Sequence, residues 1–155
     1  MLPLYLFDSW GKLQQAPPTT VLFRPAAYGI LIENNQILLQ RQPETGAWTL
    51  PGGIVPAAET PTQTVRQAVQ LAAGFVPEVG PLLFVETLHR LEDNAAWRLA
   101  ALYFHLSRPK LTYAMVDFDT PTRPEWISLN TLLREQLQSG YDAIRAAQAW
   151  QQLSR

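Results

Sequence analysis

Residues 50–75, LPGGIVPAAETPTQTVRQAVQLAAGF, contain the pattern in this sequence that is best suited to chemistry. A glycine pair ends at Gly53, and Glu59 follows after five intervening residues. Such a frame is suited to holding metal ions and a diphosphate, because divalent cations neutralise the charge that develops during diphosphate hydrolysis. The helical segment that follows, residues 60–73, contains no Asp, Glu, His or Cys. The sequence therefore poses the question whether this stretch is a hydrolytic site or only its frame.

Local signals predict a helix inside this stretch, from Thr60 to Ala73. Thr60 is suited to cap the N-terminus, and Pro61 suits the first helical position, where its missing N–H costs nothing. Gln63 stands three residues after Thr60, which is the spacing of a capping box. Gly74 is suited to end the helix in a left-handed conformation.

The elements around this helix are mostly strands. We predict strands at residues 27–33 and 36–42 joined by a tight turn at Asn34-Asn35, a short strand in WTLPGG, a hairpin at 81–91 and 96–107, a last strand at 125–129, and helices at 130–138 and 142–153. This order predicts an α/β fold with helices on both sides of a mixed sheet. His89 and His105 fall on the paired strands of the second hairpin, where they could face one another, and we interpret them as structural or rim residues.

Composition limits the class of protein. The chain has 155 residues, 47% of them apolar, and we predict a single domain over residues 1–155, in which residues 1–20 form an N-terminal strand or arm. The formal net charge is −1, so the chain as a whole does not attract nucleic acid or an acidic membrane surface electrostatically. The absence of Cys excludes disulfides, thiol catalysis and zinc–thiolate sites. No apolar run approaches the length of a membrane span, so we predict a cytoplasmic protein without membrane contact.

Residues 24–75 resemble the Nudix (MutT-like) hydrolase superfamily. Three features carry the resemblance: the first predicted hairpin, the segment GAWTLPGG that precedes the helix, and Glu59. Together with the later segment PEWISLNTL, the resemblance covers most of residues 24–150. It implies a Nudix α/β/α sandwich with a mixed central sheet flanked by helices. It also implies hydrolysis of nucleoside-diphosphate-linked compounds, Mg²⁺ or Mn²⁺ as cofactor, a small nucleotide or diphosphate ligand, and an assembly compatible with a homodimer.

The sequence matches the conserved motif of the family, the Nudix box, at its ends and departs from it in between. The box reads G-x5-E-x7-R-E-U-x-E-E-x-G-U, where U is bulky and aliphatic, and Gly53, Glu59 and Gly74 match it without a gap. The arginine of the box falls on Gln67. Its three helical glutamates, which share one helix face, are replaced by apolar residues: Ala68, Leu71 and Ala72. Mg²⁺ prefers oxygen ligands, so these three side chains cannot bind it.

Other carboxylates are candidates for displaced metal ligands or catalytic groups. Glu59 could be one ligand, or a surface charge that suits the dipole of the following helix. Glu86 lies within a predicted strand. Glu125 lies near a position where the resembled family often brings an acidic residue to the site, although a solvated loop residue is the alternative. Asp117 and Asp119 are loop candidates.

A second group of residues is expected to line a ligand cleft. By resemblance, Tyr28 and Arg41 of the first hairpin would line it. Trp48 would either stack on a flat ligand or buttress its loop. Gly52 and Gly53 are better explained by a backbone turn than by contact with phosphate.

Three hypotheses for function follow. The first is a Nudix-fold protein that lacks the magnesium-binding glutamates and binds a nucleotide-like or diphosphate ligand with little or no hydrolysis. The second is an active Mg²⁺-dependent Nudix hydrolase whose metal ligands have moved to Glu59, Glu86 and Glu125. The third is a dimeric structural or regulatory module that binds no ligand.

Overall fold

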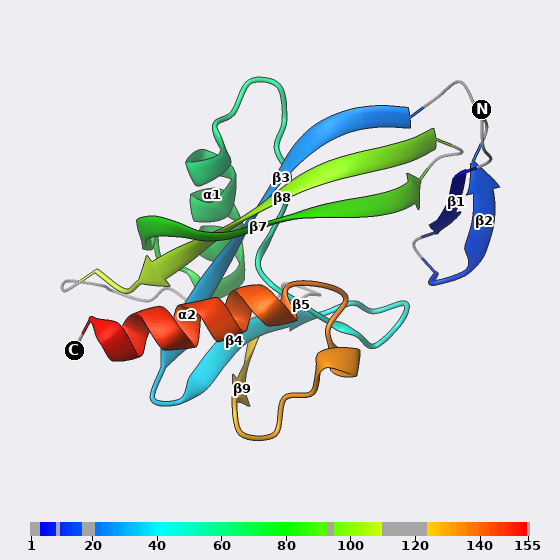
Figure 1. Ribbon diagram of the computed structural model, residues 1–155. Coiled ribbons are helices and arrows are strands. Elements are labelled where there is room, and N and C mark those ends of the chain that lie inside the picture. The colour runs from blue at the N-terminus through cyan, green and yellow to red at the C-terminus, as the bar shows by residue number, and fades with distance from the viewer. Residues whose placement is uncertain (1–3, 9, 17–20, 93–94, 110–123, 155) are drawn as a thin grey trace.

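The computed structural model describes residues 4–8, 10–16, 21–92, 95–109 and 124–154. Its strands are β1 (Leu4–Phe7), β2 (Leu13–Ala16), β3 (Val21–Glu33), β4 (Gln36–Arg41), β5 (Trp48–Thr49), β6 (Gly52–Ile54), β7 (Glu78–Glu92), β8 (Ala95–Ser107) and β9 (Pro124–Ser128). Its helices are α1 (Pro61–Ala73), the 3-10 helix η1 (Arg134–Gln136) and α2 (Tyr141–Leu153) (Figure 1). None of the helices in these residues is long and apolar enough to cross a membrane.

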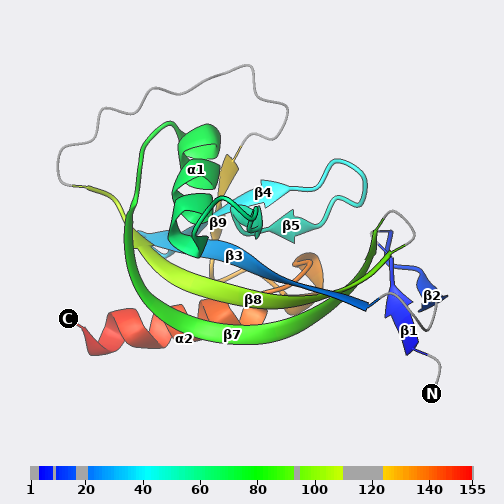
Figure 2. The ribbon, with the colours of Figure 1, turned by 90° about the horizontal axis from the view of Figure 1, so that it is seen from above.

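A sheet of mixed direction organises the chain. Its strands lie in the order β5-β4-β3-β8-β7, with β6 paired to β3 and β9 paired to β4. β3 runs parallel to β8, and the other described pairings of this sheet are antiparallel. Helices α1 and α2 lie on opposite sides of it (Figure 2). The predicted α/β/α architecture with a mixed central sheet is therefore confirmed.

Strand β3 is buried on both of its faces. Tyr28 and Ile30 pack in the core layer beneath α2, while Ala27 and Leu31 pack with Val65 in the layer beneath α1. Each of these side chains is at most 6% exposed. Successive residues of a strand point to opposite faces, so this one strand contributes to both layers of the core.

Helix α1 has the termini that its sequence predicts. Thr60 is the N-cap: its Oγ1 accepts the backbone N–H of Gln63 at 3.3 Å, and Gln63 Oε1 accepts the N–H of Thr60 at 2.8 Å. Pro61 begins the helix, and Gly74 ends it at φ +80°, in the left-handed region. The capping box thus satisfies N–H groups that a helix start otherwise leaves without partners.

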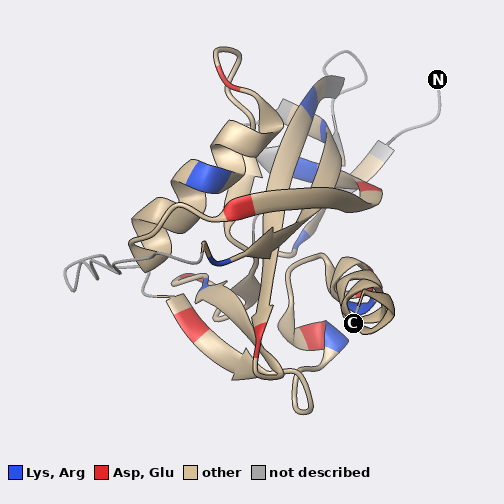
Figure 3. Cartoon of the chain, turned by 90° about the vertical axis from the view of Figure 1, so that its left-hand side faces the viewer, with Lys and Arg blue, Asp and Glu red and all other residues tan. Residues whose placement is uncertain are grey.

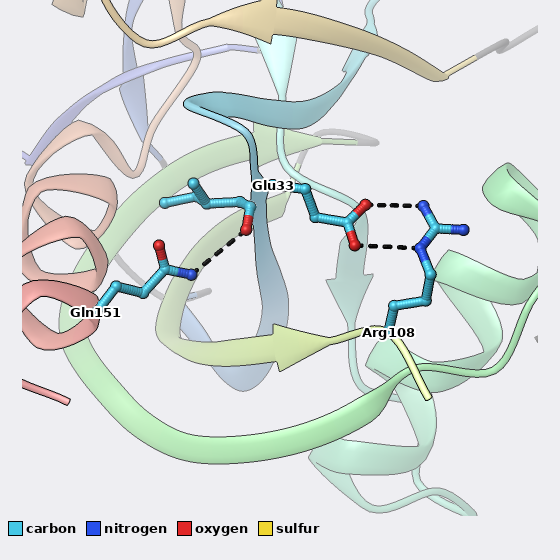
Figure 4. A network of polar contacts seen from close by, with 4 residues as sticks. Glu33, Arg108 and Gln151 are labelled. Atoms are coloured by element: carbon cyan, nitrogen blue, oxygen red, sulfur yellow. Dashed lines mark hydrogen bonds and ion pairs between the residues drawn. The ribbon is translucent and has the colours of Figure 1, made fainter. Parts of the chain in front are cut away.

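The β3–β4 hairpin is fixed at its turn and from both sides. Asn34 and Asn35 have φ angles of 51° and 60°, and two positive values are what a two-residue type I′ turn requires. Beside the turn, Arg108 donates to the Glu33 carboxylate from Nη2 at 2.8 Å and from Nε at 3.1 Å (Figure 4). Gln151 of α2 donates to a carbonyl of β3 at 3.4 Å. The end of β3 is therefore tied to both β8 and α2.

The predicted helix at residues 130–138 is wrong. Only Arg134–Gln136 form a short 3-10 turn in this segment. Leu137 forms a parallel bridge with Trp48, and the N–H of Gln138 donates to the carbonyl of Trp48 at 2.9 Å. This backbone pairing with β5 requires an extended chain, so it excludes a continuous helix.

The expectation that the two histidines could face one another is also wrong. His89 lies opposite Arg98 in the β7–β8 register, whereas His105 lies near the other end of β8. His105 is 8% exposed, and its ring centroid is 4.5 Å from that of Trp150. Its Nε2 lies 3.0 Å from the amide nitrogen of Gln151, which also donates to β3, so the His105 nitrogen accepts. This contact fits the neutral imidazole.

We expect the stability of the fold to decrease as the pH falls from 7 to 5. Burial lowers the pKa of His105 below its ordinary value of 6.5. The unfolded chain therefore takes up the proton first, and protonation opposes folding. The contribution of the neutral His105 to the free energy of unfolding is therefore complete above about pH 6.5. It decreases as the pH falls toward the lower pKa of the folded state, by at most about 1.4 kcal/mol per pH unit.

Urea unfolding of the wild type and of His105→Gln across this pH range measures the effect. The wild type should lose more stability than the variant between pH 7 and pH 5, because the variant has no imidazole at this position. Equal losses in the two proteins would contradict the assignment of a neutral, buried His105.

Candidate functional site

The glycine pair lies where β6 runs against β3. Gly52 pairs with Tyr28, and Gly53 pairs with Ala27. Gly52 has a φ of +143°, and a Cβ at this position would lie 2.0 Å from the carbonyl oxygen of Ala27. A Cβ at Gly53 would meet no atom within 4 Å. The close approach of the two backbones therefore requires glycine at position 52 but not at position 53.

Glu59 is held against the first turn of α1. Its Oε2 accepts the hydroxyl of Thr64 at 2.9 Å, and the residue is half-buried. A carboxylate at this place lies near the positive end of the helix dipole, where negative charge is favourable. These contacts give Glu59 a structural role, and its role as a metal ligand or catalytic group stays a prediction.

The box face of α1 carries no carboxylate. Leu71 is 74% exposed, Ala68 is half-buried and Ala72 is 8% exposed. Arg66 is the only charged residue of this helix, whose ribbon shows a single coloured band (Figure 3). A divalent cation on this face would have no anionic ligand from the helix, so the residues present do not fit the family's metal site.

Glu86 lies on the other side of the sheet, in contact with the core layer beneath α2. Its Oε1 accepts the hydroxyl of Tyr103 at 2.5 Å, and the same hydroxyl lies 3.4 Å from Ser139 Oγ. Burial and the hydrogen bond with Glu86 raise the pKa of Tyr103, so the phenol stays protonated as a donor. Tyr28, itself 6% exposed, stacks on Tyr103 with ring centroids 5.4 Å apart. The buried tyrosines therefore orient the Glu86 carboxylate.

Arg41 and Trp48 form a second contact on the same side. The guanidinium carbon of Arg41 lies 4.3 Å from the ring centroid of Trp48, within the range of a cation–π interaction. Trp48 is 7% exposed and packs in the layer beneath α2. Its burial favours a buttressing role for this ring, whereas the exposed Arg41 is available to a ligand.

The candidate carboxylates do not converge. Glu59 lies at the start of α1, Glu86 lies on the opposite side of the sheet, and Glu125 is exposed on β9. The part of the chain that the structure describes contains no group of three or more His, Cys, Asp or Glu that could hold a metal ion. The remaining candidates, Asp117 and Asp119, lie outside the described residues.

Two adjoining hollows follow β7 on its α2 side. The first has a volume of about 250 Å³ and lies between β7 and the segment that leads into α2; the second has about 390 Å³. Leu88 and Gln138 line both, so we treat the two as one β7 cleft. Its lining residues come from four parts of the chain: Asp8, Trp10, Gly11, Thr45, Ala47, Glu86, Leu88, His89, Arg90, Arg134, Leu137, Gln138, Ser139, Gly140, Tyr141 and Asp142.

Several residues at or beside this cleft were not among the predicted site residues. Tyr103, which contacts Glu86 but does not line the cleft, was detectable, because alternation along the paired strands places it on the same face as Glu86. Arg134 and Asp142 could not be predicted from the sequence, because the irregular segment before α2 brings them into contact. Arg134 Nη2 lies 2.8 Å from Asp142 Oδ1, and this hydrogen bond lowers the pKa of Asp142. The exposed ion pair forms part of the cleft rim.

The chain belongs to the Nudix family, because the model of the NUDIX domain matches residues 22–148. Members of this family generally hydrolyse diphosphate bonds with Mg²⁺ or Mn²⁺. A search of curated proteins gives no significant match.

Solved structures of Nudix proteins are similar in fold. The MutT NUDIX hydrolase from Burkholderia pseudomallei is 24% identical, with a TM-score of 0.55 over 81% of this chain and 95% of that chain. The MutT protein from Methanosarcina mazei Go1 is 19% identical, with a TM-score of 0.61 over 87% and 97%. An ADP-ribose pyrophosphatase from Streptococcus suis 89-1591 is 15% identical, with a TM-score of 0.58 over 83% and 91%. These likenesses establish the fold alone.

Substitution of the two adjacent glycines should have unequal effects. We expect Gly52→Ala to lower the free energy of unfolding by about 2 kcal/mol or more, because the new Cβ meets a backbone oxygen at a positive φ. Gly53→Ala should change it by less than about 0.5 kcal/mol, because the added methyl group meets open space. Urea unfolding of both variants tests this, and similar losses would contradict the close approach of β6 to β3.

The hydrogen bond that orients Glu86 should also be measurable. We expect Tyr103→Phe to reduce the free energy of unfolding by about 1–2 kcal/mol at pH 7, because it removes a buried donor to a carboxylate. Ser139→Ala is the control, with an expected loss below about 0.5 kcal/mol, because its contact with the same hydroxyl is long. If the serine variant loses as much as the tyrosine variant, the role given to Tyr103 is wrong.

Proposed function

We propose that this chain binds a small nucleoside-diphosphate-type ligand in the β7 cleft and hydrolyses it slowly or not at all. The observation that carries the proposal is the apolar box face: Ala68, Leu71 and Ala72 stand where the family has glutamates. Without these carboxylates, α1 cannot hold a divalent cation, and the sheet lies between α1 and the β7 cleft. The cleft therefore receives no cation from this helix to neutralise charge on a reacting diphosphate. The loss of these carboxylates removes the metal ligands of the helix and leaves the Nudix fold in place.

The chemistry of the β7 cleft supports a small-molecule ligand. The cleft combines the Glu86 carboxylate, the Gln138 amide and the Arg90 guanidinium with the apolar Leu88. Apolar walls with a few convergent polar groups are typical of such sites. Outside this lining, the exposed Arg41, whose guanidinium lies over Trp48, is a further cation suited to a phosphate group.

The ligand class is taken from the family and from a named relative. The similar structure from Streptococcus suis is described as an ADP-ribose pyrophosphatase, and ADP-ribose is a nucleoside-diphosphate-linked compound. Because this chain shares the family and the fold, we assign the same general class of ligand to it.

An active hydrolase with displaced metal ligands is the competing proposal. It would place Mg²⁺ or Mn²⁺ among Glu59, Glu86 and Glu125. The sheet separates Glu59 from Glu86, and the described residues bring no three acidic groups together. The described part of the chain therefore favours binding over hydrolysis.

Restoring carboxylates on the box face tests the proposal. We expect Ala68→Glu combined with Leu71→Glu to raise the affinity for Mn²⁺ about 10-fold or more over the wild type, because two carboxylates one helical turn apart can share an ion. Leu71 is 74% exposed and accepts a charge readily, whereas Ala72 is 8% exposed and is left unchanged. Isothermal titration with MnCl₂ measures the affinity.

The matched control keeps the length of the two side chains and removes their charge. Ala68→Gln combined with Leu71→Gln should gain less Mn²⁺ affinity than the box-face variant, because a neutral amide is a weaker ligand for a divalent cation than a carboxylate. Wild-type protein that binds Mn²⁺ as tightly as the box-face variant, and cleaves ADP-ribose in its presence, would overturn the proposal.

A further inference from the structure

An accessory element outside the Nudix match forms one wall of the β7 cleft. Strands β1 and β2 pair as an antiparallel hairpin, where the sequence predicted an N-terminal strand or arm, and the family match begins after them, at residue 22. The hairpin lies at the end of the long strands β3, β7 and β8 (Figure 1), and β1 lies beside β7. Its turn contributes Trp10 and Gly11 to the lining of the larger hollow.

The turn that carries Trp10 is held by Asp8. Its Oδ1 accepts the backbone N–H groups of Trp10 at 3.0 Å and Lys12 at 2.9 Å, and its Oδ2 accepts the amide of Gln14 at 2.6 Å. The Asp8 N–H donates to the carbonyl of Lys12 at 2.9 Å, and Gly11 takes a φ of +79°. A turn with this many internal hydrogen bonds holds a defined shape, so the place of Trp10 at the hollow is set by local structure.

Trp10 is 64% exposed although it is a large apolar side chain at a hollow of about 390 Å³. The apolar Leu88 and the cationic Arg90 of β7 line the same hollow as Trp10, and so does Gln138 with its amide. An aromatic ring and an aliphatic side chain that line one hollow suit a flat ligand ring, because stacking buries apolar ring surface. The amide and the guanidinium can hydrogen-bond to polar atoms at the ring edge or to an attached phosphate.

We infer that Trp10 is the stacking residue for the nucleobase of the ligand, and that the N-terminal hairpin therefore determines which ligands the cleft accepts. This inference rests on the proposed function, since it assigns the base of a nucleoside diphosphate to the larger hollow. It adds a specificity residue that the matched family segment does not contain. The phosphates of the ligand lie at Arg90.

Calorimetric titration of the full chain with ADP, GDP, CDP, UDP and ADP-ribose tests the inference. For the nucleoside diphosphate that the wild type binds best, Trp10→Ala should weaken binding about 10-fold or more, as expected for the loss of one base–aromatic stack. Trp10→Phe should retain most of the affinity, because phenylalanine keeps a ring at this position. The urea midpoints of all variants should equal that of the wild type, because Trp10 is exposed.

Trp150→Ala is the matched control, because Trp150 is 37% exposed and lines a different hollow. This variant should bind as the wild type does. If Trp10→Ala also binds as the wild type does, or if Trp10→Phe loses as much affinity as Trp10→Ala, the stacking role is wrong while the proposed function stands. If the wild type binds none of these compounds, both the stacking role and the proposed function fall.

Discussion

The burial of β3 on both faces is the constraint on which the rest of the structure depends. Its central residues alternate between a layer beneath α1 and a layer beneath α2, and its backbone pairs with β4, β6 and β8. A strand buried in this way cannot shift by one residue, because the shift would exchange the side chains of the two layers. The positions of β6, α1 and the β7 cleft all follow from this fixed register.

Local structure explains how the box can lose its carboxylates and keep two of its matching residues. Gly74 ends α1 in the left-handed conformation, and Glu59 accepts the hydroxyl of Thr64. These residues serve the fold whether or not a metal binds. The exposed Leu71 contributes little to the core, so a change of residue type there alters the chemistry and leaves the packing intact. Fold and hydrolytic chemistry are therefore separable in this segment.

The sequence was most informative where local rules act alone. The capping box at Thr60 and Gln63 and the turn at Asn34-Asn35 were predictable, because neighbouring residues decide them. The helix predicted at residues 130–138 failed, because pairing with Trp48 is a long-range contact that overrides helical propensity. The β7 cleft could be predicted only in part for the same reason, since hairpin, loop and strand meet there only after folding.

The central claim is that the chain binds a nucleoside-diphosphate compound without efficient cleavage. ³¹P NMR of ADP-ribose with Mg²⁺ and a stoichiometric amount of the full chain tests both halves of this claim in one sample. We predict shifted or broadened diphosphate resonances whose integrated area stays constant over hours. Conversion of these resonances into phosphomonoester signals at many turnovers would contradict the account, and so would resonances that the protein leaves unchanged.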